Sequence, residues 1–362
     1  MRIVHLLAPA PFGGLESVVR ALAAGQQARG HDVTVVTTID PGEHPFCAAA
    51  RADGLSVIEV TSSGRAYVRE RKEVSMLLTR LSPHVVHSHG YRPDALHLGR
   101  ARRAGAATVS TLHGFTSGDW KMRLYERLQL SALRQADAVV AVSTGVERRA
   151  IGARIPRARV HLIRNGYART ESSLSRDDAR SALGIPPDAV AVGWIGRLSP
   201  EKGPDVAVEA IARMTCPATL HVIGDGADRD TLDSRIASLG IGSRVRFHGA
   251  LPNAGRLVRA FDVLLLSSRT EGTPMVLLEA MAAGVPIVAT AVGGVPDVLP
   301  DGAALLAANE DTSALAAALD ATLTDRTASA ARAVRAGEVL DERFGLDPWL
   351  DRHDALYASV VR

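Results

Sequence analysis

Short apolar runs rich in β-branched residues alternate with longer segments of helical spacing along almost the whole chain of 362 residues. In the first half we expect strands at 2–7, 32–38, 56–60, 85–89, 108–113 and 138–143. The helical patterns that separate most of them lie at 15–29, 67–81, 93–104 and 120–135. In the second half we expect strands at 190–195, 220–224, 245–248, 263–267 and 287–290. Such alternation predicts an α/β fold in which helices cover both faces of parallel sheets.

The alternation is interrupted once, after the pair Asn165-Gly166. Residues 169–187 are rich in Ser, Arg and Asp and end in Gly-Ile-Pro-Pro, a pattern typical of a linker and an entry turn. The length suits two domains of about 150–200 residues each. We therefore expect two doubly wound, Rossmann-like domains, 1–168 and 169–345, that face each other across a cleft. Helical spacing at the end of the chain predicts a helix over 346–362 that packs back on the first domain.

Charge is distributed unevenly between the two halves. Residues 1–168 hold 23 Lys and Arg against 13 Asp and Glu, a balance of +10, whereas the remainder holds 19 against 26, a balance of −7. The first half is therefore expected to face an anionic partner. Zinc-finger spacing and aromatic RNA-binding signatures are missing from the sequence, and aromatic residues make up 4% of it, so nucleic acid is not the expected partner.

Composition also bears on the compartment. No apolar run reaches the roughly 18–20 residues needed to span a bilayer. The apolar start at 1–7 leads into a Pro/Gly loop and predicts a buried first strand rather than a signal peptide. Cys47 and Cys216 lie far apart and belong to no cluster of metal ligands. We expect a cytoplasmic protein.

The most informative segment is 267–281, Ser-Ser-Arg-Thr-Glu-Gly-Thr-Pro-Met-Val-Leu-Leu-Glu-Ala-Met. A strand is expected to end at its start, and Thr273-Pro274 looks like an N-cap followed by proline at the first helical position. The amides of the new helix would then form an anion site. Glu271 precedes this helix and Glu279 lies within it, so the two carboxylates can contact two ends of one ligand. Each Glu alone also fits a carboxylate that the helix dipole favours or a solvated helical side chain.

A second segment, Gly-Arg-Leu-Ser-Pro-Glu-Lys-Gly at 196–203, also follows an expected strand and opens a helix. Arg197 and Lys202 lie across a turn, so both can bend towards one anionic group. Lys202 is one of three lysines in an arginine-rich chain, and a compact ammonium on a diphosphate would explain that choice. Two solvated charges beside a turn are the alternative.

Two further features lie at the expected carboxyl edge of the first sheet. Gly13-Gly14 separates the first strand from the first long helix, where a tight turn needs glycine in any case. The pattern G-x-G-x-x-G is incomplete, which weakens a dinucleotide-dehydrogenase interpretation. His113 ends one expected strand, and His87 and His89 end the strand before it, but these histidines have no matched carboxylate and do not predict a metal site.

Taken together, these motifs resemble glycosyltransferase family 4. The resemblance rests on the spacing from Glu271 to Glu279, the run Glu-Ala-Met-Ala-Ala-Gly-Val-Pro-Ile-Val-Ala-Thr that ends at Thr290, and Gly293-Gly294. It covers almost the whole chain and implies the GT-B fold. In that family the first Glu lies beside the transferred sugar and the second holds the ribose hydroxyls, roles that fall here on Glu271 and Glu279.

The resemblance also implies roles for the other candidates. Arg197 and Lys202 would neutralise the leaving diphosphate, and His113 would lie beside the sugar. The remaining donor-binding residues implied are Gly13, Gly14, Leu251, Gly272, Thr273, Pro274, Met275 and Val276.

The implied reaction is the transfer of a hexose, with retention, from a nucleotide diphosphate sugar to an acceptor hydroxyl. UDP is favoured over GDP on frequency, and the acceptor is a lipid-linked sugar, a polysaccharide or a small molecule. No cofactor and no metal are expected. Asp228-Arg229-Asp230 matches a metal-binding D-x-D pattern, but it opens an expected helix, where acidic residues are favoured.

Three alternatives remain. A nucleotide-sugar epimerase can share the fold, and a nucleotide-sugar-binding scaffold could have lost activity. A phosphorylase is disfavoured because only Lys72, Lys121 and Lys202 could carry pyridoxal phosphate. Finally, the basic first half, and the segment 64–81 in particular, predicts peripheral contact with an anionic membrane face; a sheet-covering helix with an arginine-rich solvent face is the alternative.

Overall fold

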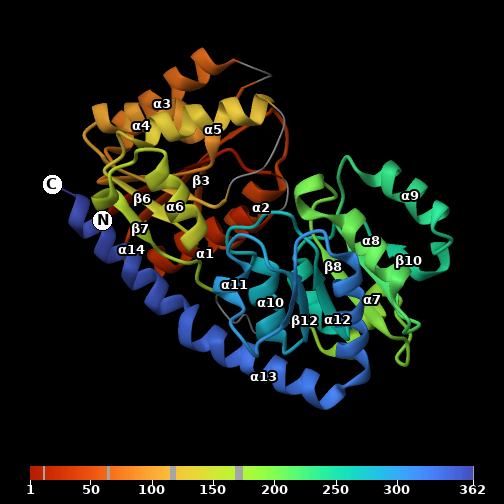
Figure 1. The fold of residues 1–362 in the computed structure, drawn as a ribbon. Helices are drawn as coiled ribbons and strands as arrows, with labels where there is room; N and C mark the ends of the chain where they lie inside the picture. Colours follow the sequence, from red (N-terminus) through yellow and green to blue (C-terminus); the bar gives the residue numbers. More distant parts are fainter. Residues whose placement is uncertain (11–12, 63–65, 115–119, 168–173, 362) are drawn as a thin grey trace. The chain divides into compact units, whose positions relative to one another are not determined.

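The computed structural model describes residues 1–10, 13–62, 66–114, 120–167 and 174–361. It divides into two compact units, Met1–Gly166 together with Leu346–Arg362, and Tyr167–Gly345 (Figure 1). The boundary lies at Gly166, just before the predicted position of 168, and the C-terminal helix α14 (Leu346–Val360) belongs to the first unit.

The first unit is built on a seven-stranded sheet in the order β3-β2-β1-β4-β5-β6-β7, and all its neighbouring strands are parallel. The strands are β1 (Arg2–Leu7), β2 (Asp32–Ile39), β3 (Ser56–Thr61), β4 (Val85–His89), β5 (Ala107–Leu112), β6 (Ala138–Ala141) and β7 (Val160–Leu162). The central strands β4 and β5 are buried along their full length. Their sequences, VVHSH and ATVSTL, mix apolar residues with buried His, Ser and Thr. Helices thus cover both faces of these strands, and the buried polar side chains need partners inside the unit.

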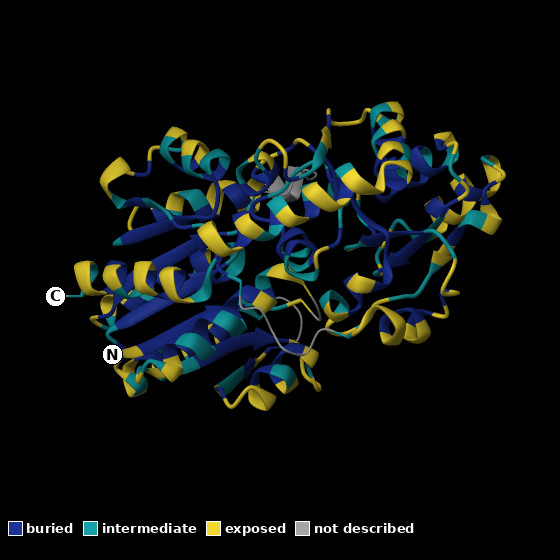
Figure 2. Ribbon diagram, turned by 90° about the horizontal axis from the view of Figure 1, so that it is seen from below, coloured by how far each residue is buried: buried dark blue, intermediate teal, exposed yellow. Residues whose placement is uncertain are grey.

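Helices cover this sheet. They are α1 (Gly14–Ala28), α2 (Pro45–Ala52), α3 (Tyr67–Leu81), α4 (Tyr91–Arg103), α5 (Trp120–Leu133), α6 (Thr144–Gly152) and the short turn η1 (Arg157–Arg159). Val74 and Leu78 of α3 pack with Ala101 of α4 against the strands. On α1, a Cβ added at Gly25 would lie 2.6 Å from Leu350, so α14 packs closely on α1. In Figure 2 the strands are buried and the helices expose one side.

The second unit has a six-stranded parallel sheet in the order β10-β9-β8-β11-β12-β13. Its strands are β8 (Ala191–Ile195), β9 (Thr219–Ile223), β10 (Val245–Phe247), β11 (Val263–Leu266), β12 (Ile287–Thr290) and β13 (Leu305–Ala307). The helices of one face are α8 (Pro204–Arg213), α9 (Arg229–Ser238) and α12 (Thr312–Thr324). The other face of the sheet is covered by α7 (Arg176–Leu183), η4 (Ala254–Ala260), α10 (Met275–Ala283), α11 (Val295–Val298) and α13 (Arg326–Arg343). Two short turns, η2 (Pro200–Lys202) and η3 (Gly242–Arg244), complete the unit.

The predicted linker over 169–187 is wrong for its central part. Residues 168–173 lie outside the described residues, but 176–183 form α7. Ser175 caps this helix by accepting a hydrogen bond from the amide of Asp178 at 3.1 Å. Buried Arg180 donates to Asp262 at 2.9 Å and to the carbonyl of Pro186 at 2.7 Å. The charged composition that suggests a linker therefore belongs to a helix that covers the second sheet.

Both sheets reverse their strand order at one place, between β1 and β4 in the first unit and between β8 and β11 in the second. Open parallel sheets bind ligands outside the carboxyl ends of the strands at such a switch point. None of the helices in the described ranges is long and apolar enough to cross a bilayer.

Candidate active site

Two loops meet at the switch point of the second unit. The loop 196–203 follows β8, and the loop 267–274 follows β11. They contain six of the residues singled out in the sequence: Arg197, Lys202, Glu271, Gly272, Thr273 and Pro274. Since β8 and β11 are neighbours in the sheet, the fold places both segments at one edge.

Arg269 ties the two loops together. Its amide donates to the carbonyl of Glu201 at 2.9 Å, and its guanidinium donates to the carbonyl of Pro200 at 2.7 Å. The same guanidinium donates to both carboxylate oxygens of Asp205, at 2.9 and 2.7 Å. Burial alone would raise the pKa of Asp205, but the hydrogen bonds from Arg269 lower it below its usual value. Two parallel charge-assisted bonds of this kind fix an orientation as well as a distance.

A second link runs through Ser267 at the end of β11. Trp194 Nε1 donates to its hydroxyl at 3.0 Å, and the hydroxyl donates to the carbonyl of Gly203 at 2.6 Å. Gly203 has φ +61°, and any Cβ there would overlap the carbonyl oxygen of Ser267. Only glycine can therefore bring the two backbones this close.

Lys202 and Glu271 form the central pair of this site. Lys202 Nζ donates to Glu271 Oε1 at 2.7 Å, and the Ser268 hydroxyl donates to the same oxygen at 2.6 Å. The Glu271 side chain is 6% exposed and that of Lys202 28%. The structure thus brings together a cation expected at the diphosphate and a carboxylate expected at the sugar.

The glycine pair of the next loop supports Glu271 from behind. The amide of Gly294 donates to the carbonyl of Glu271 at 3.1 Å. Gly293 has φ +54°, and a Cβ there would overlap the same carbonyl oxygen. The Gly293-Gly294 part of the sequence resemblance therefore has a local steric reason.

Arg197 points more freely into solvent. Its side chain is 64% exposed and lies 3.8 Å from the carboxylate of Glu201. Arg197 and Lys202, which we expected to turn towards one anionic group, therefore have separate carboxylate partners in this structure.

Helix α10 begins one residue later than predicted. It starts at Met275, and Pro274 is the flanking residue, with an extended ψ of 115° that excludes it from the helix. The prediction of Thr273 as N-cap is therefore wrong. Gly272, Thr273 and Pro274 are buried, and Met275 and Val276 pack on the apolar cluster beneath the helix.

Glu279 lies on α10, against the turn η4. A Cβ added at Gly255 would lie 2.5 Å from its carboxyl carbon, so no side chain fits between them. Burial raises the pKa of Glu279 to about 7. Leu251 precedes η4 and packs on the cluster that includes Phe261. Glu279 is therefore a carboxyl held close to the point of titration at neutral pH.

In the first unit, Gly13 and Gly14 lie exposed at the start of α1. Glu16 turns back over this turn, and its Oε1 accepts a hydrogen bond from the amide of Ala10 at 2.7 Å. A Cβ at Gly13 would overlap the other carboxylate oxygen of Glu16. Gly13 has an extended φ of 176°, so a side chain there would displace the Glu16 carboxylate but would not strain the backbone.

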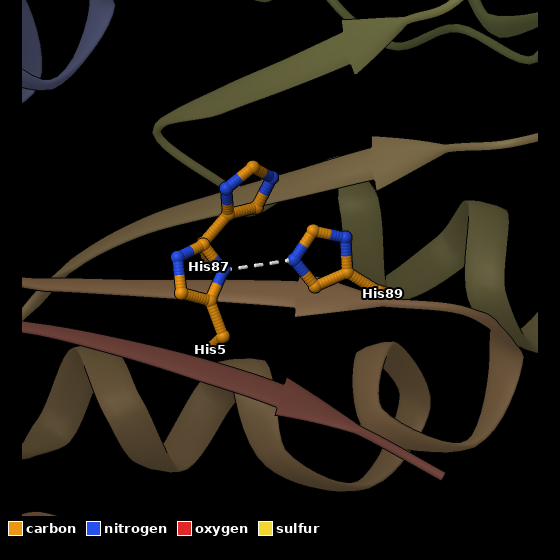
Figure 3. A group of neighbouring side chains, drawn as sticks. All are labelled: His5, His87 and His89. Carbon is orange, nitrogen blue, oxygen red and sulfur yellow. Dashed lines mark hydrogen bonds between the residues drawn. The ribbon is translucent and has the colours of Figure 1, made fainter. Parts of the chain in front are cut away.

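His113 follows β5 and is not isolated. Its Nε2 lies 3.1 Å from Nδ1 of His89, and burial lowers its pKa to about 4. His89 in turn contacts His5, and Figure 3 shows the rings of His5 and His89 beside that of His87. Sequence reasoning missed His5, although the spacing of His87 and His89 places both on one face of β4.

Within the described residues, His5, His87 and His89 are the histidines that lie close enough together to hold a metal ion, with one nitrogen from each inside 4.8 Å of the others. The D-x-D pattern lies elsewhere, at the start of α9. Asp228 is the residue before this helix and Asp230 lies in its first turn.

Two doubly wound units in one chain are the architecture of the GT-B fold. The described fold is similar to that of the Anabaena protein HepE in complex with UDP-glucose, with a TM-score of 0.88 and 21% identity over 99% of this chain and 100% of that one. This similarity confirms the predicted fold class.

The family follows from the sequence comparisons. Residues 12–170 match the model of Glycosyltransferase Family 4, and residues 175–339 match that of Glycosyl transferases group 1. The chain is 30% identical over 243 residues to the lipopolysaccharide core biosynthesis mannosyltransferase LpsB of Rhizobium meliloti, covering 64% of this chain and 68% of that protein. The chain belongs to the family-4 glycosyltransferases, as the motifs predicted.

A second group of relatives matches a shorter part. The D-inositol 3-phosphate glycosyltransferase of Mycobacterium marinum is 33% identical over 199 residues, which cover 52% of this chain and 41% of that protein. The match thus spans about two fifths of the length of this relative.

Proposed function

We propose that this glycosyltransferase transfers a hexose from a UDP-sugar to an acceptor hydroxyl with retention of the anomeric configuration. The observation that carries the proposal is the contact of 2.7 Å between Lys202 and Glu271 at the switch point of the second unit. In a nucleotide sugar the terminal phosphate is bonded directly to the anomeric carbon. A cation and a carboxylate held side by side match that junction, with Lys202 on the phosphate and Glu271 on the sugar hydroxyls.

Charge stabilisation is the main chemical contribution of this site. Negative charge develops on the diphosphate as the sugar departs, and Lys202, Arg197 and the amides at the start of α10 are the groups that would stabilise it. Ser267, Gly203 and Arg269 hold these loops in place before the donor arrives, so little reorganisation is needed at the moment of reaction. The departing phosphate would take up the acceptor proton on the same face, which leads to retention.

Glu279 would accept hydrogen bonds from the ribose hydroxyls, as the family resemblance implies. The missing side chain at Gly255 leaves room for its carboxyl group beside η4. We propose that no metal ion takes part, because Lys202 and Arg197 supply the positive charge that a divalent ion would otherwise provide.

The acceptor is proposed to carry negative charge. The first half of the sequence has a balance of +10, and one group of relatives bears the name D-inositol 3-phosphate glycosyltransferase. A phosphorylated or lipid-linked hydroxyl compound would suit this charge.

One experiment separates the candidates. The protein is incubated with UDP-glucose, UDP-galactose or GDP-mannose, with and without inositol phosphate, and the products are followed by proton NMR. Release of nucleotide diphosphate with an α-linked product supports the proposal. Interconversion of UDP-sugars would identify an epimerase, and binding without turnover would identify a scaffold.

The same assay tests metal independence. We expect the turnover rate to be unchanged in excess EDTA. Loss of turnover that Mg²⁺ or Mn²⁺ restores would show that a divalent ion is needed and would direct attention to Asp228 and Asp230.

A further inference from the structure

Four histidines lie at the switch point of the first unit. His5 on β1 is opposite His87 on β4 in the sheet register, and His89 follows on the same face of β4. The side chains of His5, His87 and His89 are buried. His113 continues from the neighbouring strand β5. A polar cluster of this size inside a sheet requires an explanation, because unsatisfied buried polar groups are costly.

Three of these rings and one amide form a single chain of hydrogen bonds. Gln26 Oε1 lies 2.8 Å from His5 Nε2, and His5 Nδ1 lies 3.1 Å from His89 Nε2. His89 Nδ1 lies 3.1 Å from His113 Nε2. Figure 3 shows the central contact between His5 and His89. A neutral imidazole has one nitrogen that donates and one that accepts, so the direction of one bond determines the direction of all.

The rings in this chain are neutral. Burial lowers the pKa of His5 and of His113 to about 4 and that of His89 well below its usual value. Each ring therefore carries one hydrogen near neutral pH.

Tyr357 of α14 sets the direction. Its hydroxyl lies 2.6 Å from Nδ1 of His87 and 3.2 Å from the amide nitrogen of Gln26. The shorter distance belongs to the range of an O–H donor and is below the roughly 2.7–3.2 Å of N–H donors. Tyr357 therefore donates to His87 and accepts from Gln26, and His87 Nε2 donates to Thr111, 2.7 Å away. Because the amide nitrogen of Gln26 faces Tyr357, its oxygen faces His5 and accepts.

We propose that Gln26, His5 and His89 are positioning residues that hold His113 in the single tautomer with its hydrogen on Nε2. His5 donates to Gln26, His89 donates to His5, and His113 donates to His89. Nδ1 of His113 is then left with a lone pair, and it can accept a hydrogen bond but cannot donate one. The use of this tautomer in ligand selection rests on the proposed function. An accepting nitrogen favours a ligand hydroxyl, which can donate a hydrogen bond, over a carbonyl or phosphate oxygen, which cannot.

The same cluster could be considered as a metal site, since one nitrogen from each of His5, His87 and His89 lies within 4.8 Å of the others. However, both nitrogens of His87 already contact Tyr357 and Thr111, and both of His5 contact Gln26 and His89. An ion would break at least one of these bonds. The hydrogen-bonded arrangement leaves none of these four ring nitrogens without a partner.

Nitrogen NMR of the ligand-free protein labelled with ¹⁵N in its histidines tests the proposal at pH 7. The resonances of His113 are assigned by their loss in His113→Gln. We expect Nε2 to be protonated and Nδ1 to be unprotonated. A hydrogen on Nδ1 would show that the chain runs the other way and would overturn the proposal, as would stoichiometric zinc in the purified protein.

Variants of Gln26 test the origin of the tautomer. Gln26→Met removes the acceptor at the end of the chain, so His113 is expected to become a mixture of tautomers. Gln26→Glu keeps an acceptor and is expected to restore the hydrogen to Nε2. His87→Gln is the matched control: the new amide oxygen can still accept from Tyr357, so the direction of the chain is kept, and position 87 lies on the branch to Thr111 and not on the path to His113. An unchanged single tautomer in Gln26→Met would overturn the inference.

Neither outcome depends on catalysis. The wild-type measurement alone decides the tautomer if a variant does not fold. A protein that lacks transferase activity but keeps the hydrogen on Nε2 of His113 would refute the proposed function and leave the positioning chain intact.

Discussion

At the scale of single residues, the salt bridge between Lys202 and Glu271 gives the most direct test of the site. Replacing Lys202 or Arg197 by Ala should reduce transition-state stabilisation by roughly 2–4 kcal/mol, the range for a lost donor to developing negative charge. That corresponds to a decrease of about 30- to 1000-fold in kcat/KM. Steady-state kinetics with UDP-glucose measure it. Arg213→Ala is the control, because this arginine pairs within α8 with Glu209. Wild-type turnover in either site variant would remove that residue from the mechanism.

The raised pKa of Glu279 leads us to expect that both stability and UDP affinity depend on pH, in opposite directions. Its pKa is raised from 4.5 to about 7 by burial, so the folded protein holds this proton more tightly than the unfolded chain. The stability that the neutral carboxyl contributes is therefore full below pH 4.5 and is lost as the pH rises through 7. In the proposed binding mode the ionised form of Glu279 accepts hydrogen bonds from the ribose of UDP, so we expect the affinity for UDP to increase roughly tenfold from pH 6 to pH 8.

Calorimetric titration of UDP at several pH values measures this increase. Glu279→Gln should bind UDP more weakly, and its affinity should change with pH only as far as the phosphate of UDP itself titrates. Glu338→Gln replaces an exposed carboxylate on α13 and should behave as wild type. Equal pH dependence of UDP affinity in Glu279→Gln and wild type would show that another group titrates.

Glu271→Ala, by contrast, should leave UDP binding unchanged and reduce the rate of sugar transfer.

The sequence identified Lys202 and Glu271 separately but could not pair them. Each lies in a short motif beside the end of a strand, which local pattern reveals. Their contact joins positions 69 residues apart and depends on β8 and β11 being neighbours. Gln26 and Tyr357, 331 residues apart, had no local signal at all. Arg269 lies inside the most informative segment, but its role was missed because its partners Pro200 and Asp205 are 69 and 64 residues away.

At the scale of the elements, the approach of the two loops in the second unit depends on Gly203. This residue combines φ +61° with a Cβ position that overlaps the carbonyl of Ser267. Gly284, the C-cap of α10, has φ +67° but open space around its Cβ position. Gly284→Ala should therefore cost only the backbone strain, about 1–2 kcal/mol, whereas Gly203→Ala should cost more and also displace Lys202.

Thermal or urea unfolding of both variants, together with their kcat, separates the two contributions. The prediction fails if Gly203→Ala and Gly284→Ala lose equal stability and both keep wild-type kcat. In that case the closeness of the loops would not matter for the reaction.

Elements were predictable where the pattern was long and unambiguous. The strands with β-branched runs and the helix over 67–81 lie where the periodicity placed them. Two strands of three residues, β7 (Val160–Leu162) and β13 (Leu305–Ala307), were missed. The equally short β10 was predicted because Val and Phe favour strands, whereas the Leu and Ala of β13 do not. Helix α7 was missed because its exposed face is highly charged and only Ala179 and Leu183 add apolar surface beneath it.

At the scale of the whole molecule, the first half of the sequence is basic and the second acidic. The structure adds which charged residues of α3 are buried and which face the solvent. Glu70 is buried on α3 and accepts hydrogen bonds from Arg92 and His97 of α4. It therefore does not offset the basic residues on the solvent side of α3. Those exposed basic residues are Arg69, Arg71, Lys72 and Arg80, and Arg65, which also belongs to the predicted segment, lies outside the described residues.

This surface of α3 also exposes apolar side chains. Val74 and Leu78 face the sheet, but Val68 is 83% exposed and Met76 57% exposed. Basic residues next to exposed apolar ones suit contact with an anionic lipid surface, where each cation adds about 1 kcal/mol. We therefore predict that the protein binds vesicles containing phosphatidylglycerol and that binding weakens strongly with salt.

Sedimentation with such vesicles at low and high ionic strength measures the effect. Val68→Ser with Met76→Ser should reduce pelleting at low salt without loss of stability, because neither side chain is part of the core. Val334→Ser is the control: this valine is 64% exposed on α13 of the second unit, whose half of the sequence is acidic, so the substitution should leave pelleting unchanged. Arg71→Glu with Lys72→Glu should abolish the salt-sensitive part. Negligible pelleting of the wild type at both ionic strengths would leave α3 as a helix that covers the sheet and presents its arginines to water.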